Sequence, residues 1–247
     1  MTRDYNSEAK SREGKKYDYE FDSLVRHYMM RSFSPFFKDG GALELGCHEG
    51  NSTQLLSEHF EDLTVVEASS DAILVAKKQV VSSVKFINST FEDVTFDRKF
   101  DSIFLINTLE HLDDPISILT RIRGWLAENG RFYVLVPNAD APSRQIAVQM
   151  GLFKTNNSVS EGEWVHGHRR TYSFDALEAD IRSAGFLVQQ RGGLMFKALA
   201  NFQIDKALEA GIIDLNYIEG IYNLGMLYPS MCASIYMICS HPDTGVA

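Results

Sequence analysis

The sequence has few cysteines, no long apolar run and no surplus of basic residues. Cys47, Cys232 and Cys239 have neither the number nor the spacing of a disulfide framework or a zinc site, so we expect reduced thiols and no metal. No run approaches the roughly 18 apolar residues of a membrane helix, and the charged N-terminus has no apolar signal core, so we expect a cytoplasmic protein.

The charge balance also excludes a class of partners. The formal net charge is −9, whereas broad binding to nucleic acid or to an anionic membrane needs a basic surface. We therefore predict a small-molecule partner and neither nucleic acid nor membrane, and we leave a homodimer open.

The length and the local patterns predict one main domain. Residues 1–16 are polar, charged and aperiodic, which favours a flexible tail ahead of a single domain over residues 17–247. Within residues 17–38, Phe21, Leu24 and Tyr28 belong to an apolar pattern at helical spacing, so we expect a helical cap.

From Gly41 onward, short apolar runs alternate with helical patterns. This alternation predicts β-α-β units and a buried, mostly parallel sheet with helices on both faces, a doubly wound α/β fold. Residues 195–229 are largely helical and too long for a hairpin loop, so they form an insertion that can act as a lid. The apolar runs are ALELG, LTVVEA, VKFIN, DSIFLIN, RFYVLVP, GFLVQQ and CASIYMICS.

Ligands of such sheets bind beyond the carboxyl ends of the strands, where this chain has a glycine loop. Gly46 and Gly50 follow the first strand, and Glu67 ends the second strand 21 positions after Gly46, a spacing typical of an acid that binds ribose hydroxyls. Asn51 and Gln54 have capping-box spacing at the next helix. A dinucleotide fingerprint would need glycines where His48 and Asn51 stand, which disfavours a nicotinamide enzyme.

Each of these signals also has a purely structural interpretation. The loop could be an ordinary turn and Glu67 a solvated carboxylate. Phe91 and Glu92, after the third strand, could flank a flat base and bind its amine, or could belong to loop and core packing.

Taken together, the segments resemble class I S-adenosylmethionine-dependent methyltransferases, with the ubiquinone-biosynthesis and type 12 small-molecule enzymes nearest in pattern. ELGCHEG resembles that family's E/D-x-G-x-G-x-G loop with His48 in place of the middle glycine, and FDSIFLINTLEHLDDP resembles its fourth strand and the segment after it. WLAENGRFYVLVPNA resembles the next element, although AENG departs from the usual L-x-P-G-G. The resemblance covers residues 40–140 well and AGFLV more weakly.

The resemblance implies a seven-stranded sheet with its last strand antiparallel and S-adenosyl-L-methionine as cofactor. It implies methyl transfer to an oxygen or nitrogen of a small molecule, such as a sugar or quinone-type metabolite, with anionic acceptors among the candidates. The cofactor residues that it implies are Glu44, Gly46, Cys47, His48, Gly50, Glu67, Ala68, Phe91, Glu92, Asn107 and Thr108.

Three histidines are candidates for a base that removes the acceptor's proton: His111, after the fourth strand, and His166 and His168 in EWVHGHRRTY. Arg169 and Tyr172 in the same basic segment are candidates for binding the acceptor, as is Tyr28 of the helical cap. A structural role remains open for each of them.

Two alternative functions remain. The chain could be an NAD(P)-dependent oxidoreductase with a related fold, or a non-catalytic protein that keeps S-adenosylmethionine as a structural or regulatory ligand.

Overall fold

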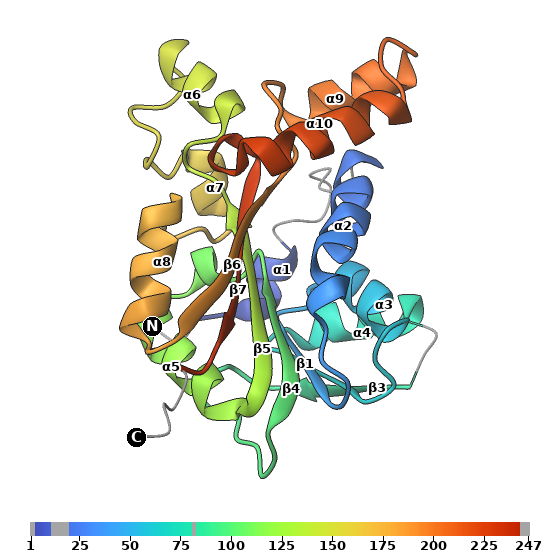
Figure 1. Cartoon of the computed structure of the whole chain (residues 1–247), viewed down its shortest axis with the longest axis vertical. Coiled ribbons are helices and arrows are strands. Elements are labelled where there is room, and N and C mark those ends of the chain that lie inside the picture. Colours follow the sequence, from blue (N-terminus) through green and yellow to red (C-terminus); the bar gives the residue numbers. More distant parts are fainter. Residues whose placement is uncertain (1–2, 11–19, 81–82, 243–247) are drawn as a thin grey trace.

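The computed structural model describes residues 3–10, 20–80 and 83–242, and its centre is a seven-stranded sheet (Figure 1). The strand order is β3-β2-β1-β4-β5-β7-β6. The first five strands in this order are parallel, and β7 runs antiparallel to both of its neighbours. The strands are β1 (Ala42–Leu45), β2 (Leu63–Glu67), β3 (Val84–Asn88), β4 (Phe100–Ile106), β5 (Leu126–Pro137), β6 (Leu187–Leu194) and β7 (Ser234–Ser240).

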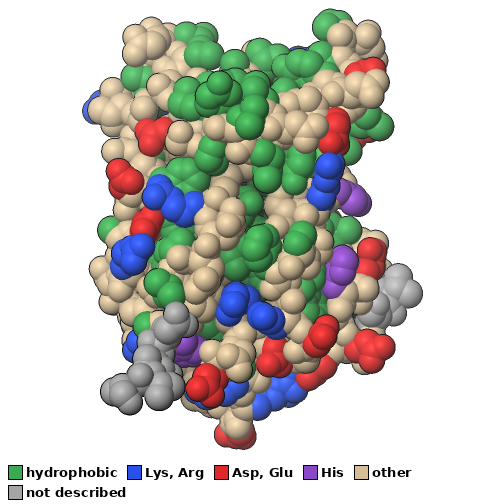
Figure 2. Space-filling model, in the orientation of Figure 1, with side chains coloured by type: hydrophobic (Ala, Val, Ile, Leu, Met, Phe, Trp, Pro, Cys, Tyr) green, Lys and Arg blue, Asp and Glu red, His purple; other side chains and the backbone are tan. Residues whose placement is uncertain are grey.

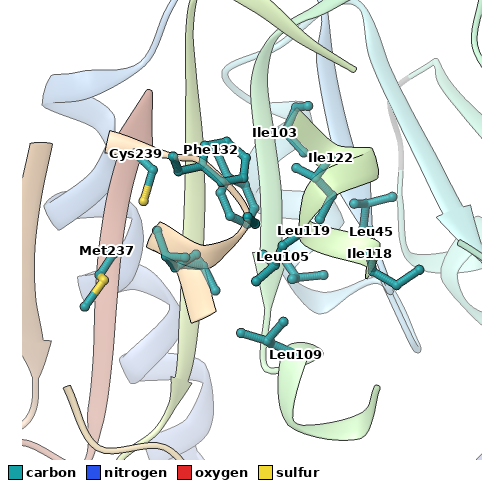
Figure 3. Close-up of a cluster of buried hydrophobic side chains, with 14 of the residues drawn as sticks. Leu45, Ile103, Leu105, Leu109, Ile118, Leu119, Ile122, Phe132, Met237 and Cys239 are labelled. Carbon is teal, nitrogen blue, oxygen red and sulfur yellow. The ribbon is translucent and has the colours of Figure 1, made fainter. Parts of the chain in front are cut away.

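Helices cover both faces of the sheet, which confirms the doubly wound fold predicted from the sequence (Figure 1). On one face, α5 (Pro115–Trp125) and α8 (Phe174–Ser183) pack on Leu105, Phe132 and Met237 (Figure 3). The other face carries α2 (Glu20–Phe33), α3 (Asn51–Ser57) and α4 (Ser70–Gln79). Strands β1, β4 and the second half of β5 are therefore buried on both sides, which is why their sequences are mostly apolar.

Local capping chemistry sets where several helices begin. The Asp114 carboxylate accepts a hydrogen bond from the Ser117 N–H (3.1 Å), and Pro115 supplies the first helical position of α5. Helix α3 differs from its prediction because Gly50, with φ of 88°, occupies the cap and Asn51 is already helical. The expected capping box of Asn51 with Gln54 is therefore wrong.

The helical cap and the insertion contact each other beyond the carboxyl end of the sheet. The insertion contains α9 (Asn201–Glu209), α10 (Leu215–Leu227) and the short 3-10 helix η3 (Pro229–Met231). Asp205 of α9 accepts hydrogen bonds from the N–H groups of Glu20 and Phe21 at the start of α2 (3.1 and 2.9 Å). The 3-10 helix η1 (Ser34–Phe36) ends the cap.

Three short elements were not expected from the sequence. Residues 5–10 of the predicted flexible tail form helix α1 (Tyr5–Lys10), whereas residues 11–16 lie outside the described part. The other two are α7 (Glu161–Val165) and the 3-10 helix η2 (Leu109–His111); helix α6 (Pro142–Gln149) lies between β5 and α7. Across the described ranges, no helix is both long and apolar enough to cross a membrane.

Candidate functional site

A cavity of about 1160 Å³ opens at the carboxyl ends of β1, β2, β4 and β5. Its walls also include residues of α1, α2 and the loops around α7 and α9. A cavity of this size exceeds the usual upper bound for one drug-sized ligand, about 1000 Å³, and can hold two small molecules side by side.

The loop after β1 has three residues with positive φ: Gly46 (81°), His48 (47°) and Gly50 (88°). A Cβ atom at Gly46 would lie 2.7 Å from Thr108 Oγ1, and one at Gly50 would lie 2.8 Å from Ala76 Cβ, so neither position has room for a side chain. His48 adopts the left-handed conformation that histidine tolerates better than most residues. The loop therefore keeps its turn although its middle glycine is replaced.

Glu67 lies at the end of β2 beside this loop, and its carboxylate is fixed by two backbone donors. The N–H of Ser69 donates to Oε1 (2.8 Å) and the N–H of His48 donates to Oε2 (3.1 Å). Glu67 also lines the cavity. This arrangement ties the loops after β1 and β2 together and presents an oriented acceptor to a ligand.

Most of the expected cofactor residues line the cavity, but two do not. The residues that do are Gly46, Cys47, His48, Glu67, Ala68, Phe91, Glu92, Asn107 and Thr108. Glu44 and Gly50 are absent from the lining. Glu44 is only 1% exposed and accepts a hydrogen bond from Thr53 Oγ1 (2.5 Å), and burial raises its pKa to about 8. Its hydrogen bond with Thr53 links β1 to α3, and its direct contact with the cofactor remains a prediction.

The structure brings the three candidate histidines together at one end of the cavity. His111 belongs to η2 after β4, whereas His166 and His168 follow α7, and all three line the cavity. The rings of His111 and His168 meet edge to face, with centroids 4.7 Å apart. His111 and His168, which are 57 positions apart in the sequence, thus form one imidazole cluster, and His166 lines the same cavity outside it.

Arg169 and Tyr172 follow these histidines in sequence, but neither lines the cavity. The guanidinium of Arg169 lies over the ring of Trp164 (5.0 Å), and its Nε donates to Asp113 Oδ1 (3.3 Å). Tyr172 is 2% exposed and its hydroxyl donates to Asp180 Oδ2 (3.0 Å). Tyr172 is thus directed toward α8 and Arg169 toward Trp164 and Asp113, and contact of either residue with the acceptor remains a prediction.

Tyr28 is also directed away from the cavity. Its hydroxyl donates to Glu219 Oε2 (2.9 Å), and its ring packs against Tyr222 of α10. The face of α2 that lines the cavity carries Asp22, Val25, Arg26 and Met29 instead. The helix was predicted, but Tyr28 lies on the face that packs against α10, and its contact with the acceptor remains a prediction.

Sequence reasoning missed Lys197, a buried lysine that lines the cavity after β6. The residue is 5% exposed, and its ammonium group donates a hydrogen bond to the Leu199 backbone oxygen (2.7 Å). Burial lowers the pKa of Lys197 to about 8, against the opposing attraction of Asp22, which lines the same wall. The signal that could have identified Lys197 was its position shortly after the end of β6.

A second cation in the lining, Arg144 of α6, is already paired. Its guanidinium contacts the carboxylate of Glu163, and the distance from Arg144 Nη2 to Glu163 Oε2 is 3.2 Å. Burial alone would raise the pKa of Glu163, but Arg144 and the Ser160 N–H bring it below its usual value. Lys197 is therefore better placed than Arg144 to meet an anionic ligand.

Comparisons with known proteins agree with this geometry. A family model described as a methyltransferase domain matches residues 17–191, more than half of the chain. The trans-aconitate 2-methyltransferase of Acidovorax sp. (strain JS42) is 31% identical over 42% of this chain, which spans only 41% of that relative's length. The ubiquinone biosynthesis O-methyltransferase of Aeromonas salmonicida (strain A449) is 22% identical over 71% of this chain and 73% of its own.

Solved structures share the fold. The N-methyltransferase NodS from Bradyrhizobium japonicum WM9, in complex with S-adenosyl-L-homocysteine, superposes with a TM-score of 0.61. That similarity covers 97% of this chain and 98% of NodS at 14% identity.

Proposed function

The chain belongs to the class I S-adenosylmethionine-dependent methyltransferases, and on that premise we propose that it transfers a methyl group from S-adenosylmethionine to a small molecule. The observation that carries the proposal is the oriented carboxylate of Glu67 at the edge of a cavity that also reaches three histidines. The acceptor atom is an oxygen or a nitrogen.

The residues of the loop end of the cavity fit the proposed cofactor. Glu67 offers carboxylate oxygens to a ribose diol, and the nearly buried ring of Phe91 offers an apolar wall to a flat base. Glycine at position 46 lets the loop lie against Thr108, because a Cβ atom there would clash with the Thr108 side chain. The cofactor supplies an electrophilic methyl group on a sulfonium, and the chain's task is to hold an acceptor in line with it.

We place the acceptor at the histidine end of the same cavity. An imidazole within hydrogen-bond reach of a hydroxyl or amine can take up the proton that methyl transfer releases. His111, His166 and His168 are the described side chains that suit this role.

We further propose that the acceptor carries a negative charge. Lys197 would place an ammonium group on the cavity wall in a position removed from bulk water, where its attraction for an anion is stronger than in solvent. One relative is named for trans-aconitate, which is a carboxylate. This supports small carboxylates or phosphates ahead of neutral sugars and quinones.

The direct test is methyl transfer itself. The purified chain is incubated with S-adenosylmethionine and a panel of carboxylate, phosphate, catechol and amine acceptors, and S-adenosylhomocysteine release is followed by mass spectrometry. We expect release that depends on one acceptor class, with carboxylates and phosphates first. Binding of S-adenosylmethionine without transfer to any acceptor would favour a non-catalytic cofactor-binding protein, and binding of NAD(P)H in its place would favour an oxidoreductase.

A further inference from the structure

Glu110, His111 and His168 form a cluster in which one potential ligand atom of each residue lies within 4.8 Å of the others. All three line the cavity at its histidine end. Two imidazoles and one carboxylate are a donor set that proteins use to bind divalent transition metals while leaving positions open for substrate.

We propose that Glu110, His111 and His168 bind a divalent transition-metal ion, with Zn²⁺ as the reference ion. Hard cations such as Mg²⁺ prefer sites made of oxygen atoms, so the two imidazoles favour a first-row transition metal. Zinc lies about 2.0–2.2 Å from nitrogen and oxygen ligands. Small side-chain rotations therefore suffice to bring the three donors around one ion.

The backbone holds the two halves of this site together. Glu110 and His111 are consecutive in η2, and the N–H of Arg169, next to His168, donates to the backbone oxygen of Glu110 (2.8 Å). The N–H of His168 donates in turn to the backbone oxygen of Glu163 in α7 (3.0 Å). The ligand from the later loop is thus fixed against η2 before any ion binds, which lowers the ordering cost of binding.

Burial of Glu110 would shield a bound ion from bulk water. The residue is 1% exposed, and the attraction between a carboxylate and a cation is stronger in such surroundings than in solvent. Since Glu110, His111 and His168 all reach the cavity, a bound ion would keep its remaining coordination positions on the acceptor side.

The proposed ion would change the chemistry assigned to the histidines, and this step rests on the proposed function. A divalent cation that binds an acceptor hydroxyl lowers the pKa of that hydroxyl and so favours the nucleophilic alkoxide. His111 and His168 would then be metal ligands, and His166, outside the cluster, would remain the candidate base. The sequence could not show this site because His168 is 57 positions from His111.

The experiment uses the full chain without a polyhistidine tag. The protein is treated with a chelator, dialysed and titrated with Zn²⁺ by calorimetry, and with Co²⁺ by visible absorption. We expect one ion per chain, with affinity reduced at least tenfold in Glu110→Gln and His168→Ala. The matched controls are His166→Ala, which keeps the neighbouring imidazole cluster intact, and His27→Ala on the exposed face of α2; both should bind metal as the unaltered chain does.

The outcomes separate this proposal from the proposed function. S-adenosylmethionine binding is measured on the same metal-free and metal-loaded samples. Cofactor binding without metal binding, or metal binding lost equally in His27→Ala, would overturn the metal site and leave the proposed function standing. Metal binding without cofactor binding would overturn the proposed function alone. Circular dichroism of each variant shows whether it has folded.

Discussion

The carboxyl group of Glu44 is buried outside the cavity lining, and its raised pKa makes the stability of the fold depend on pH. Because burial raises its pKa from 4.5 to about 8, the folded chain holds an extra proton between these two pH values. The free energy of unfolding therefore falls as pH rises through that window, by at most about 1.4 kcal/mol per pH unit.

Glu44→Gln mimics the protonated acid and should remove this pH dependence. We expect the variant to match the unaltered chain near pH 5 and to exceed it in unfolding free energy near pH 8. Urea unfolding at a series of pH values measures this, with Glu58→Gln on the exposed end of α3 as the control. Parallel pH profiles for Glu44→Gln and the unaltered chain would contradict the assignment.

We expect Lys197 to lower the free energy of unfolding at neutral pH and to strengthen binding of an anionic acceptor. Its folded-state pKa of about 8 lies below its ordinary value of 10.5, so stability rises as pH increases from 8 to 10.5, where the ammonium group loses its proton. We expect Lys197→Met to raise the free energy of unfolding at pH 7 by about 1–3 kcal/mol, because it removes a buried charge, and to weaken binding of an anionic acceptor.

The measurement is urea unfolding of Lys197→Met at pH 7 and pH 10, compared with Lys206→Met on the exposed face of α9. The stabilisation should shrink at pH 10. An equal loss of stability at both pH values would show that Lys197 contributes through packing rather than through a desolvated charge.

At the scale of single residues, the sequence predicted positions better than orientations. Glu67 ends β2 and His111 belongs to the segment after β4, so strand order alone places them at the cavity. The hydroxyl groups of Tyr28 and Tyr172 instead point toward Glu219 and Asp180. Side-chain direction depends on the helix that packs alongside, and such contacts leave no periodic trace in the sequence.

At the scale of elements, helix α2 depends on a distant partner. Both carboxylate oxygens of Asp205 in α9 accept from N–H groups in the first turn of α2, which otherwise have no partner within the helix. These bonds couple the helical cap to the insertion across more than 180 residues of sequence.

Asp205→Ala should therefore lower the free energy of unfolding by about 1–2 kcal/mol, the usual range for loss of a helix cap. Asp205→Asn, which keeps one oxygen acceptor, should lose less. Thermal and urea unfolding measure both, with Glu209→Ala at the exposed end of α9 as the control. If Asp205→Ala behaves like Glu209→Ala, the α2–α9 coupling is not a stabilising feature.

The strands and most helices could be predicted because their signals are local. Apolar runs predicted β1, β4 and residues 131–137 of β5, and Asp114 with Pro115 is a local signal for the start of α5. Helices α1 and α7 were not predicted because they are one or two turns long and have little apolar periodicity. Short helices of this kind depend on contacts with the rest of the chain.

At the scale of the whole molecule, one cavity joins the cofactor loop to the histidine cluster. The same end of the molecule carries many exposed apolar side chains on α6 and α10, visible in Figure 2. These include Met150 at the end of α6 and Leu215, Met226 and Leu227 of α10, each more than half exposed. The sequence indicated both ends of the cavity separately, but only the fold shows that they are continuous.

The most direct test of the account is a calorimetric titration of S-adenosylmethionine into the full chain and into Glu67→Ala. We predict one site per chain, at least several-fold weaker binding in Glu67→Ala, because the ribose loses its carboxylate acceptor, and unchanged binding in the surface control Glu58→Ala. Unchanged affinity in Glu67→Ala would contradict the ribose assignment, and binding of NAD(P)H with no binding of S-adenosylmethionine would contradict the account as a whole.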